Sequence, residues 1–127
     1  MVYLDSSALV KLVVPEAESA SLRTYVTARS PLSSCSIARV EVVRAVRPHG
    51  PQHVDTARAL LDELDLAQLD DELLDLACEL DAPLRSHDAI HIAAALELGD
   101  ELEALVTYDA GMARAAEALG LAVVSPT

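Results

Sequence analysis

Short apolar runs alternate along this chain with longer stretches in which apolar residues recur every three or four positions. The short runs are typical of buried strands and cover residues 2–4, 32–35, 66–69, 105–107 and 122–124. The longer stretches have the period of amphipathic helices and cover residues 6–14, 16–29, 36–46, 53–64, 71–80, 88–98 and 110–119. This alternation predicts an α/β fold with a central, mostly parallel β-sheet flanked by α-helices.

Several residues mark where the predicted helices begin and end. Ser6 or Ser7, and later Ser36, stand where an N-cap hydroxyl is expected. Pro15 follows the first helix, and Pro48 follows the helix that begins at Ser36. The helix predicted over residues 71–80 is expected to bury its apolar positions, Leu73, Leu74, Ala77 and Cys78, and to turn its acids toward solvent.

Composition favours one domain that spans residues 1–127. The chain has 127 residues, 52% of them hydrophobic, but it has no Phe or Trp, so its core must be aliphatic. No segment approaches the roughly 20 apolar residues of a membrane span, and Asp5 interrupts any signal-peptide core. We therefore expect a cytoplasmic protein with no membrane partner, in which Cys35 and Cys78 are reduced and buried. Apolar stripes on several helices also predict a symmetric homodimer.

The net charge of −12 is unusual for a protein that binds nucleic acid, because phosphate recognition relies on Lys and Arg. The charge is distributed unevenly, however. Residues 19–50 contain five arginines and one acid, a charge of +4, which leaves −16 for the rest of the chain. Three of these arginines share the predicted helix of residues 36–46 or directly follow it, and they are candidates for RNA binding: Arg39, Arg44 and Arg47.

Four carboxylates occupy positions from which an α/β protein assembles a site. Asp5 and Asp109 follow predicted strands, and in open α/β sheets ligands bind outside the carboxyl ends of the strands. Asp88 begins a predicted helix, and Glu41 lies beside the apolar stripe of another. We expect all four side chains to reach one crevice.

Carboxylates gathered in one crevice repel each other unless a cation neutralises them. Oxygen ligands without cysteine select Mg²⁺ or Mn²⁺. Such ions, held at the scissile phosphate of a polyanion, orient water and stabilise the leaving oxygen. The residues alone therefore favour metal-dependent hydrolysis of phosphodiester bonds.

Four segments carry a resemblance to a known family: L-D-S-S-A-L-V-K-L at the start, S-x-A-R-V-E-V-V-R-A around Glu41, D-A-I-H-I-A-A-A from Asp88, and V-T-Y-D ending at Asp109. In order and spacing they resemble PIN-domain ribonucleases over nearly the whole chain. The small size is similar to that of the VapC toxins of bacterial toxin–antitoxin pairs. The resemblance implies a single PIN-like nuclease domain and an endoribonuclease that acts as the toxin of a type II toxin–antitoxin system.

The resemblance also implies roles for individual residues and partners. Asp5, Glu41, Asp88 and Asp109 match the family's metal-binding, catalytic acids. Ser6 and Thr107 match hydroxyl residues that support those acids. Some family members carry a further acid at the position of Met112, so its absence here bears on a second metal site. The implied partners are RNA, a VapB-like antitoxin and a second copy of the chain.

Other interpretations of the same residues stay open at this point. A non-catalytic regulatory protein could use PIN-like acids to grip an arginine-bearing partner. His87 and His91 have a spacing that can hold zinc, although the chain lacks the Glu of H-E-x-x-H. A packed helix position is the favoured interpretation of His91. The serines lie in no G-x-S-x-G turn, and the single acid after the first strand argues against a two-component receiver.

Overall fold

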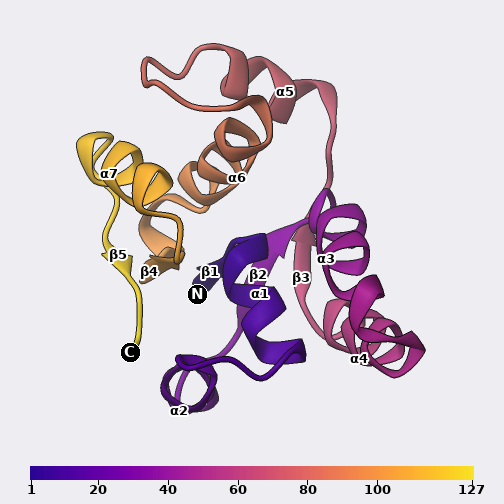
Figure 1. Cartoon of the computed structure of the whole chain (residues 1–127). Helices are drawn as coiled ribbons and strands as arrows, with labels where there is room; N and C mark the ends of the chain where they lie inside the picture. The colour runs from indigo at the N-terminus through magenta and orange to yellow at the C-terminus, as the bar shows by residue number, and fades with distance from the viewer.

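A five-stranded β-sheet in the order β3-β2-β1-β4-β5 forms the centre of the computed structural model, which describes residues 1–127. All four strand pairings are parallel. The strands are β1 (Val2–Leu4), β2 (Leu32–Cys35), β3 (Asp65–Ala67), β4 (Ala104–Val106) and β5 (Val123–Val124). The predicted α/β class and parallel sheet are confirmed (Figure 1).

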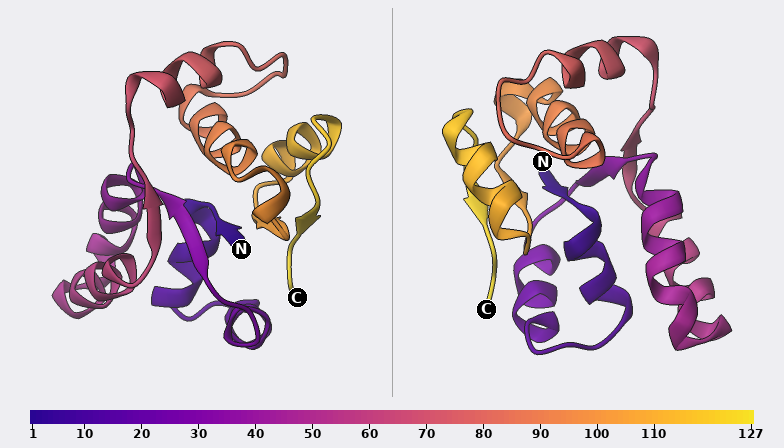
Figure 2. Two further views of the ribbon diagram at one scale, coloured as in Figure 1. Left: turned by 180° about the vertical axis from the view of Figure 1, so that it is seen from behind. Right: turned by 45° about the horizontal axis from the view of Figure 1, so that its top comes forward.

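Seven α-helices cover the two faces of this sheet. They are α1 (Ser6–Val13), α2 (Ser19–Thr27), α3 (Ala38–Val46), α4 (Pro51–Asp62), α5 (Asp71–Cys78), α6 (Ser86–Glu97) and α7 (Ala110–Ala118). Two short 3-10 turns, η1 (Arg47–His49) and η2 (Gly99–Glu101), connect some of them. Figure 2 shows α1 to α4 grouped on one side of the sheet and α5 to α7 on the other.

The alternation of side chains along the central strands divides the core into two clusters. Val2 and Leu4 of β1 pack with residues of α1 to α4. Tyr3, between them, points to the opposite face and packs with residues of α5, α6 and α7. Successive residues of a strand face opposite sides of a sheet, so a strand covered by helices on both faces is buried throughout. Every residue of β1 and β4 is buried accordingly.

Several predicted boundaries and caps were wrong. Asp5, rather than Ser6 or Ser7, is the N-cap of α1. Ser36 does not cap α3, because its hydroxyl accepts a hydrogen bond from the backbone N–H of Leu69 instead. The helix predicted to begin at Asp88 begins two residues earlier, at Ser86. Only the contact between Ser36 and Leu69 joins distant segments, so local sequence could not show it.

The helix α5 is less buried than its apolar pattern predicts. Leu73 is fully buried, but Leu74 is 37% exposed and Cys78 is also exposed. Both cysteines are free thiols, and only Cys35 is buried. The prediction that Cys78 is buried was therefore wrong, because α5 lies at the edge of the core and contacts mainly α6. No helix in the protein has the length and apolar character to cross a membrane.

Candidate metal and active site

Asp5 lies between β1 and α1, and its side chain accepts three hydrogen bonds. Its Oδ1 accepts hydrogen bonds from the backbone N–H of Ala8 at 3.0 Å and from Ser7 Oγ at 2.6 Å. Its Oδ2 accepts a short hydrogen bond from Thr107 Oγ1. Burial raises the pKa of the Asp5 carboxyl, since only 3% of the residue is exposed, and these hydrogen bonds partly oppose the rise. A nearby cation would favour its charged form.

Asp109 lies beyond the neighbouring strand β4, at the N-cap of α7. Its Oδ1 accepts a hydrogen bond from the backbone N–H of Met112 at 2.9 Å. Thr107 links the ends of the two strands, because its hydroxyl donates to Asp5 and accepts from the backbone N–H of Asp109 at 3.1 Å. Ser7 adds a second link, since its Oγ accepts from the backbone N–H of Tyr108 at 2.9 Å. The parallel pairing of β1 with β4 thus fixes both acids at one edge of the sheet.

Glu41 reaches the same edge from the first turn of α3. Its Oε1 accepts hydrogen bonds from Ser6 Oγ at 2.7 Å and from His91 Nε2 at 2.6 Å. Burial alone would raise the pKa of Glu41, but the hydrogen bonds from His91 and Ser6 outweigh it and lower the pKa. Glu41 is therefore held as a carboxylate.

Asp88 enters from the first turn of α6 and is paired with an arginine. Arg85 Nε donates to Asp88 Oδ2 at 3.1 Å, and Arg85 Nη2 donates to Asp109 Oδ2 at 3.3 Å. His87 Nε2 lies 3.5 Å from Asp88 Oδ1. The Arg85 guanidinium thus bridges two carboxylates, while its side chain is 67% exposed.

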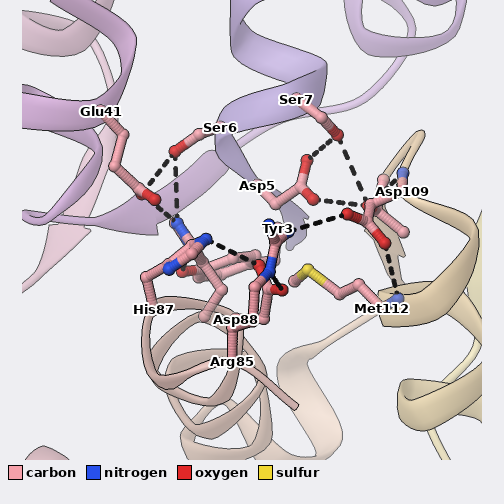
Figure 3. Close-up of polar contacts among 12 residues, drawn as sticks. Tyr3, Asp5, Ser6, Ser7, Glu41, Arg85, His87, Asp88, Asp109 and Met112 are labelled. Carbon is pink, nitrogen blue, oxygen red and sulfur yellow. Dashed lines mark hydrogen bonds and ion pairs between the residues drawn. The ribbon is translucent and has the colours of Figure 1, made fainter. Parts of the chain in front are cut away.

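The four predicted acids line one small pocket. Figure 3 shows their side chains and the polar contacts among them. The pocket has a volume of about 140 Å³ and no hydrophobic residue in its wall. Its lining consists of Asp5, Ser6, Ser7, Glu41, Arg85, His87, Asp88, His91 and Asp109. A water molecule takes up roughly 30 Å³ of liquid, so the space suits an ion with a few waters rather than an organic cofactor.

The donor set of this pocket fits a hard divalent cation. Four carboxylates and two hydroxyls supply only oxygen, which Mg²⁺ and Mn²⁺ prefer. In the arrangement described here, no group of three His, Cys, Asp or Glu side chains is spaced to hold a metal ion. The contacts explain this spacing, because Glu41 is paired with His91, while Asp88 and Asp109 are both paired with Arg85. The residue types fit the ion, and Arg85 partly neutralises two of the four acids, Asp88 and Asp109.

Zinc binding by His87 and His91 is disfavoured by the contacts of His91. Both ring nitrogens of His91 are already engaged, Nδ1 by Tyr3 Oη at 2.7 Å and Nε2 by Glu41 Oε1. The residue is 1% exposed, in line with the expected packed position.

Sequence reasoning missed three contributors to this site. Ser7 was weighed as a helix cap or a nucleophile, but its hydrogen bond to Asp5 was not predicted. Arg85 stands three residues before Asp88, a spacing that places two side chains on one face of a helix. Tyr3 carried no signal, because its partner His91 is 88 residues away. Met112 stands where some family members carry a further acid. Its side chain is 2% exposed and packs in the core instead of lining the pocket.

The three candidate RNA-binding arginines are exposed, and none lines the acidic pocket. Arg39 instead borders a separate hollow of about 560 Å³ between α3 and α4, together with Arg58. None of Arg39, Arg44 and Arg47 belongs to an ion pair of the protein. Their guanidinium groups are therefore free to meet a ligand outside the pocket.

Comparisons with known proteins agree with this geometry. A family model described as "PIN domain" matches residues 2–118. Ribonuclease VapC46 of Mycobacterium tuberculosis (strain ATCC 25618 / H37Rv) is 47% identical over 127 residues, which cover 99% of this chain and 98% of the relative. Ribonuclease VapC47 of Mycobacterium tuberculosis (strain CDC 1551 / Oshkosh) is 41% identical over 132 residues, which cover 99% and 97%.

Solved structures share the fold at low sequence identity. Mycobacterium tuberculosis VapC20, described as a Sarcin-Ricin loop cleaving toxin, has a TM-score of 0.80 at 16% identity and covers 99% of this chain and 100% of its own. A toxin–antitoxin complex from Klebsiella pneumoniae has a TM-score of 0.74 at 19% identity and covers 100% and 98%. The match of the family model and the identity of the ribonucleases over almost the full length show that this chain belongs to the PIN-domain family, among the VapC ribonucleases.

Proposed function

We propose that this protein is a metal-dependent endoribonuclease that acts as the toxin of a type II toxin–antitoxin pair. One observation carries the proposal: four carboxylates from four separate elements line a single small pocket that has no apolar wall. The relatives named ribonucleases support the same reaction class, hydrolysis of RNA phosphodiester bonds.

The cofactor in this proposal is Mg²⁺ or Mn²⁺, held by Asp5, Glu41, Asp88 and Asp109. When bound, such an ion lowers the pKa of water and neutralises charge on the phosphate oxygens. The protein contributes oriented carboxylates that accept protons from an attacking water. No side chain has to act as a covalent nucleophile.

Neutral hydroxyls keep these acids in place without cancelling their charge. Thr107 and Ser7 bind Asp5, and Ser6 binds Glu41. Partners of this kind orient metal ligands and raise the affinity of the site. Thr107 and Ser6 therefore serve as supporting donors, and Ser7 joins them in this role.

The RNA chain is longer than the acidic pocket, so its neighbouring phosphates need contacts elsewhere. Arg39, Arg44 and Arg47 are exposed on or just after α3, the helix that also carries Glu41. We propose that they hold the RNA backbone beside the cleavage site, while the negative charge of the other surfaces repels it.

The proposed protein partners are a VapB-like antitoxin and a second copy of this chain. Structural neighbours include a toxin–antitoxin complex from Klebsiella pneumoniae and VapBC2 from Rickettsia felis bound to a DNA fragment. A net charge of −12 suits a basic antitoxin. Self-association follows from exposed apolar side chains, of which Val40 is 60% exposed. Light scattering should give the mass of a dimer at tens of micromolar, roughly the range of weak dimers, and a monomer there would contradict the dimer.

A second candidate function is a non-catalytic regulator that grips an arginine of its partner. The bridge from Arg85 to Asp88 and Asp109 favours it, because it is an example of these acids holding a guanidinium. Both functions use the same pocket, but only the nuclease needs a metal.

Cleavage of RNA by the purified protein separates these two functions. Cleavage should stop with EDTA and return with excess Mg²⁺ or Mn²⁺. Asp5→Asn should be inactive, whereas the control Asp55→Asn, an exposed acid on α4, should cleave like the parent. Cleavage that survives EDTA would contradict the metal mechanism. Absence of cleavage together with retained antitoxin binding would favour the regulator.

A further inference from the structure

A buried polar chain runs from the sheet to the acidic pocket, and the proposed reaction does not yet explain it. Tyr3 lies on β1 and His91 on α6, and each is 1% exposed. Their rings meet edge to face, with centroids 5.8 Å apart and planes at 74°. The chain of hydrogen bonds then continues from His91 to Glu41 on α3. Three elements that are distant in sequence thus meet through these side chains (Figure 3).

The hydrogen bond from Tyr3 decides which nitrogen of His91 carries the proton. The Tyr3 hydroxyl lies 2.7 Å from Nδ1, and a phenol O–H at that distance can donate to an imidazole nitrogen that carries no hydrogen. A neutral imidazole has one donor and one acceptor nitrogen. With Nδ1 as acceptor, the hydrogen of His91 lies on Nε2 and points to Glu41 Oε1 at 2.6 Å.

The two donors to Glu41 converge on the same oxygen. Ser6 Oγ and His91 Nε2 both bind Oε1, so Oε2 receives neither of these hydrogen bonds. The carboxylate is therefore fixed through one oxygen, and the protein makes no hydrogen bond to the other. His91 stands three residues after Asp88 on α6, which places both side chains on the face of the helix that borders the pocket.

Packing alone does not account for a tyrosine and a histidine at these positions. Burying polar groups costs free energy unless each is hydrogen-bonded, and an aliphatic pair would fill a core without that requirement. The buried hydrophobic residues around this pair are mainly aliphatic, and the chain has no Phe or Trp. The polar pair occurs only where the core meets the acidic pocket.

We propose that Tyr3 and His91 are positioning residues, which fix Glu41 through Oε1 so that Oε2 is presented to the divalent cation. Tyr3 selects the tautomer of His91, and His91 orients the carboxylate. This proposal rests on the role of Glu41 in the proposed metal site. Partners that orient metal ligands typically change metal affinity by about 10- to 100-fold when they are removed.

The first experiment measures Mn²⁺ binding by calorimetry in variants of His91. His91→Leu removes the donor but fills the space, and its Mn²⁺ dissociation constant should rise about 10-fold or more. His91→Gln can still donate to Glu41 from its amide and should recover part of the loss. Ile92→Val, a change at the adjacent and fully buried residue of α6, is the control and should bind Mn²⁺ like the parent. Equal weakening in the Leu, Gln and Val variants would overturn the proposal, and so would parental binding by His91→Leu.

The second experiment reads the tautomer of His91 without any metal. Nitrogen-15 NMR of histidine-labelled protein should show Nε2 protonated and Nδ1 unprotonated, with the signal assigned by its loss in His91→Gln. Tyr3→Phe keeps the ring but removes the hydroxyl, so it should shift His91 away from this single tautomer and weaken Mn²⁺ binding. A proton on Nδ1 in the parent would overturn the proposed relay.

The two measurements separate failure of this proposal from failure of the metal site. A parent protein that binds no Mn²⁺ would refute the metal site and the positioning role that depends on it. Normal Mn²⁺ binding with the opposite tautomer would refute only the relay from Tyr3. Tyr3→Phe removes a single oxygen atom and keeps the ring, so we expect this variant to fold in both measurements.

Discussion

Asp5 and Glu41 receive their hydrogen bonds from buried or half-buried groups, chiefly hydroxyls, whereas Asp88 and Asp109 share one exposed arginine. The hydroxyl donors thus orient the first two acids without neutralising them. The other two are partly neutralised by Arg85, whose side chain is 67% exposed. One pocket combines two ways of holding a carboxylate.

The difference matters because the two kinds of contact are not equally permanent. Thr107 is fully buried, so water cannot replace its hydrogen bond to Asp5 when that bond breaks. An exposed ion pair contributes little, typically about 0–1 kcal/mol, because water and salt compete for both charges. We infer that the side of Asp5 and Glu41 is pre-arranged for a ligand, while the side of Asp88 and Asp109 must exchange Arg85 for it.

The largest effect is expected for the acids of the pre-arranged side. Asp5→Asn and Glu41→Gln should each reduce RNA cleavage by more than the roughly 100-fold upper range for outer partners of a metal site. Thermal unfolding of Asp5→Asn should be unchanged or occur at higher temperature, because one repelling charge is gone and the amide oxygen can still cap α1. A strongly destabilised Asp5→Asn would mean that its negative charge is needed for folding rather than for the reaction.

Removal of a buried donor should be the next largest effect. Thr107→Val keeps the shape but leaves Asp5 and the backbone N–H of Asp109 each without a partner. The free energy of unfolding, measured with urea, should fall by about 1–3 kcal/mol. A loss below that of Arg85→Ala would reverse the comparison between the two sides.

Arg85→Ala should have a smaller effect on stability and an opposite effect on metal binding. Its ion pairs are exposed, so the free energy of unfolding should fall by less than about 1 kcal/mol. Because the ion no longer competes with Arg85, the Mn²⁺ dissociation constant should decrease, by up to about 5-fold for 1 kcal/mol. Arg114→Ala, an exposed arginine on α7, is the control and should change neither quantity. Weaker Mn²⁺ binding by Arg85→Ala would show that Arg85 supports the metal site instead of competing for it.

The smallest expected effect concerns the arginines outside the pocket. In an Asp5→Asn background that does not cleave RNA, Arg44→Ala and Arg47→Ala should weaken RNA binding. Each should reduce the slope of log affinity against log salt by up to roughly 0.7 for single-stranded RNA. Arg23→Ala, whose guanidinium binds a backbone carbonyl of the protein, serves as the control. Parental slopes in both variants would limit RNA recognition to the pocket itself.

Sequence patterns predicted best those features that depend on neighbouring residues. The strands of residues 2–4 and 32–35 were predicted with their observed bounds, because each is a short run without helical period. The places of Asp5 and Asp109 followed from a rule about strand ends in parallel sheets. The place of Glu41 beside an apolar stripe followed from the helical period of residues 36–46 alone.

Contacts between distant segments were beyond such patterns. The pairing of Tyr3 with His91 joins residues 88 positions apart, and nothing local to either residue indicates it. The burial of α5 depends on which other elements cover it, and its own sequence does not show this. Its apolar pattern therefore predicted more burial than the structure has. The bridge from Arg85 to Asp109 likewise spans 24 positions and joins the residues that directly precede α6 and α7. In each case the contact depends on how distant elements pack against each other.

The hydrogen bond from Thr107 to Asp5 closes a loop of 102 residues, and this has a consequence for the time at which the protein becomes harmful. Asp5 is synthesised early, but strand β4 and the hydrogen-bond donor Thr107 are made about 100 residues later. Contacts between such distant segments form late, since the intervening chain must first be ordered. A growing or truncated chain would therefore carry Asp5 and Glu41 without the rest of their pocket. The nuclease would become active only after nearly all of its domain had been translated.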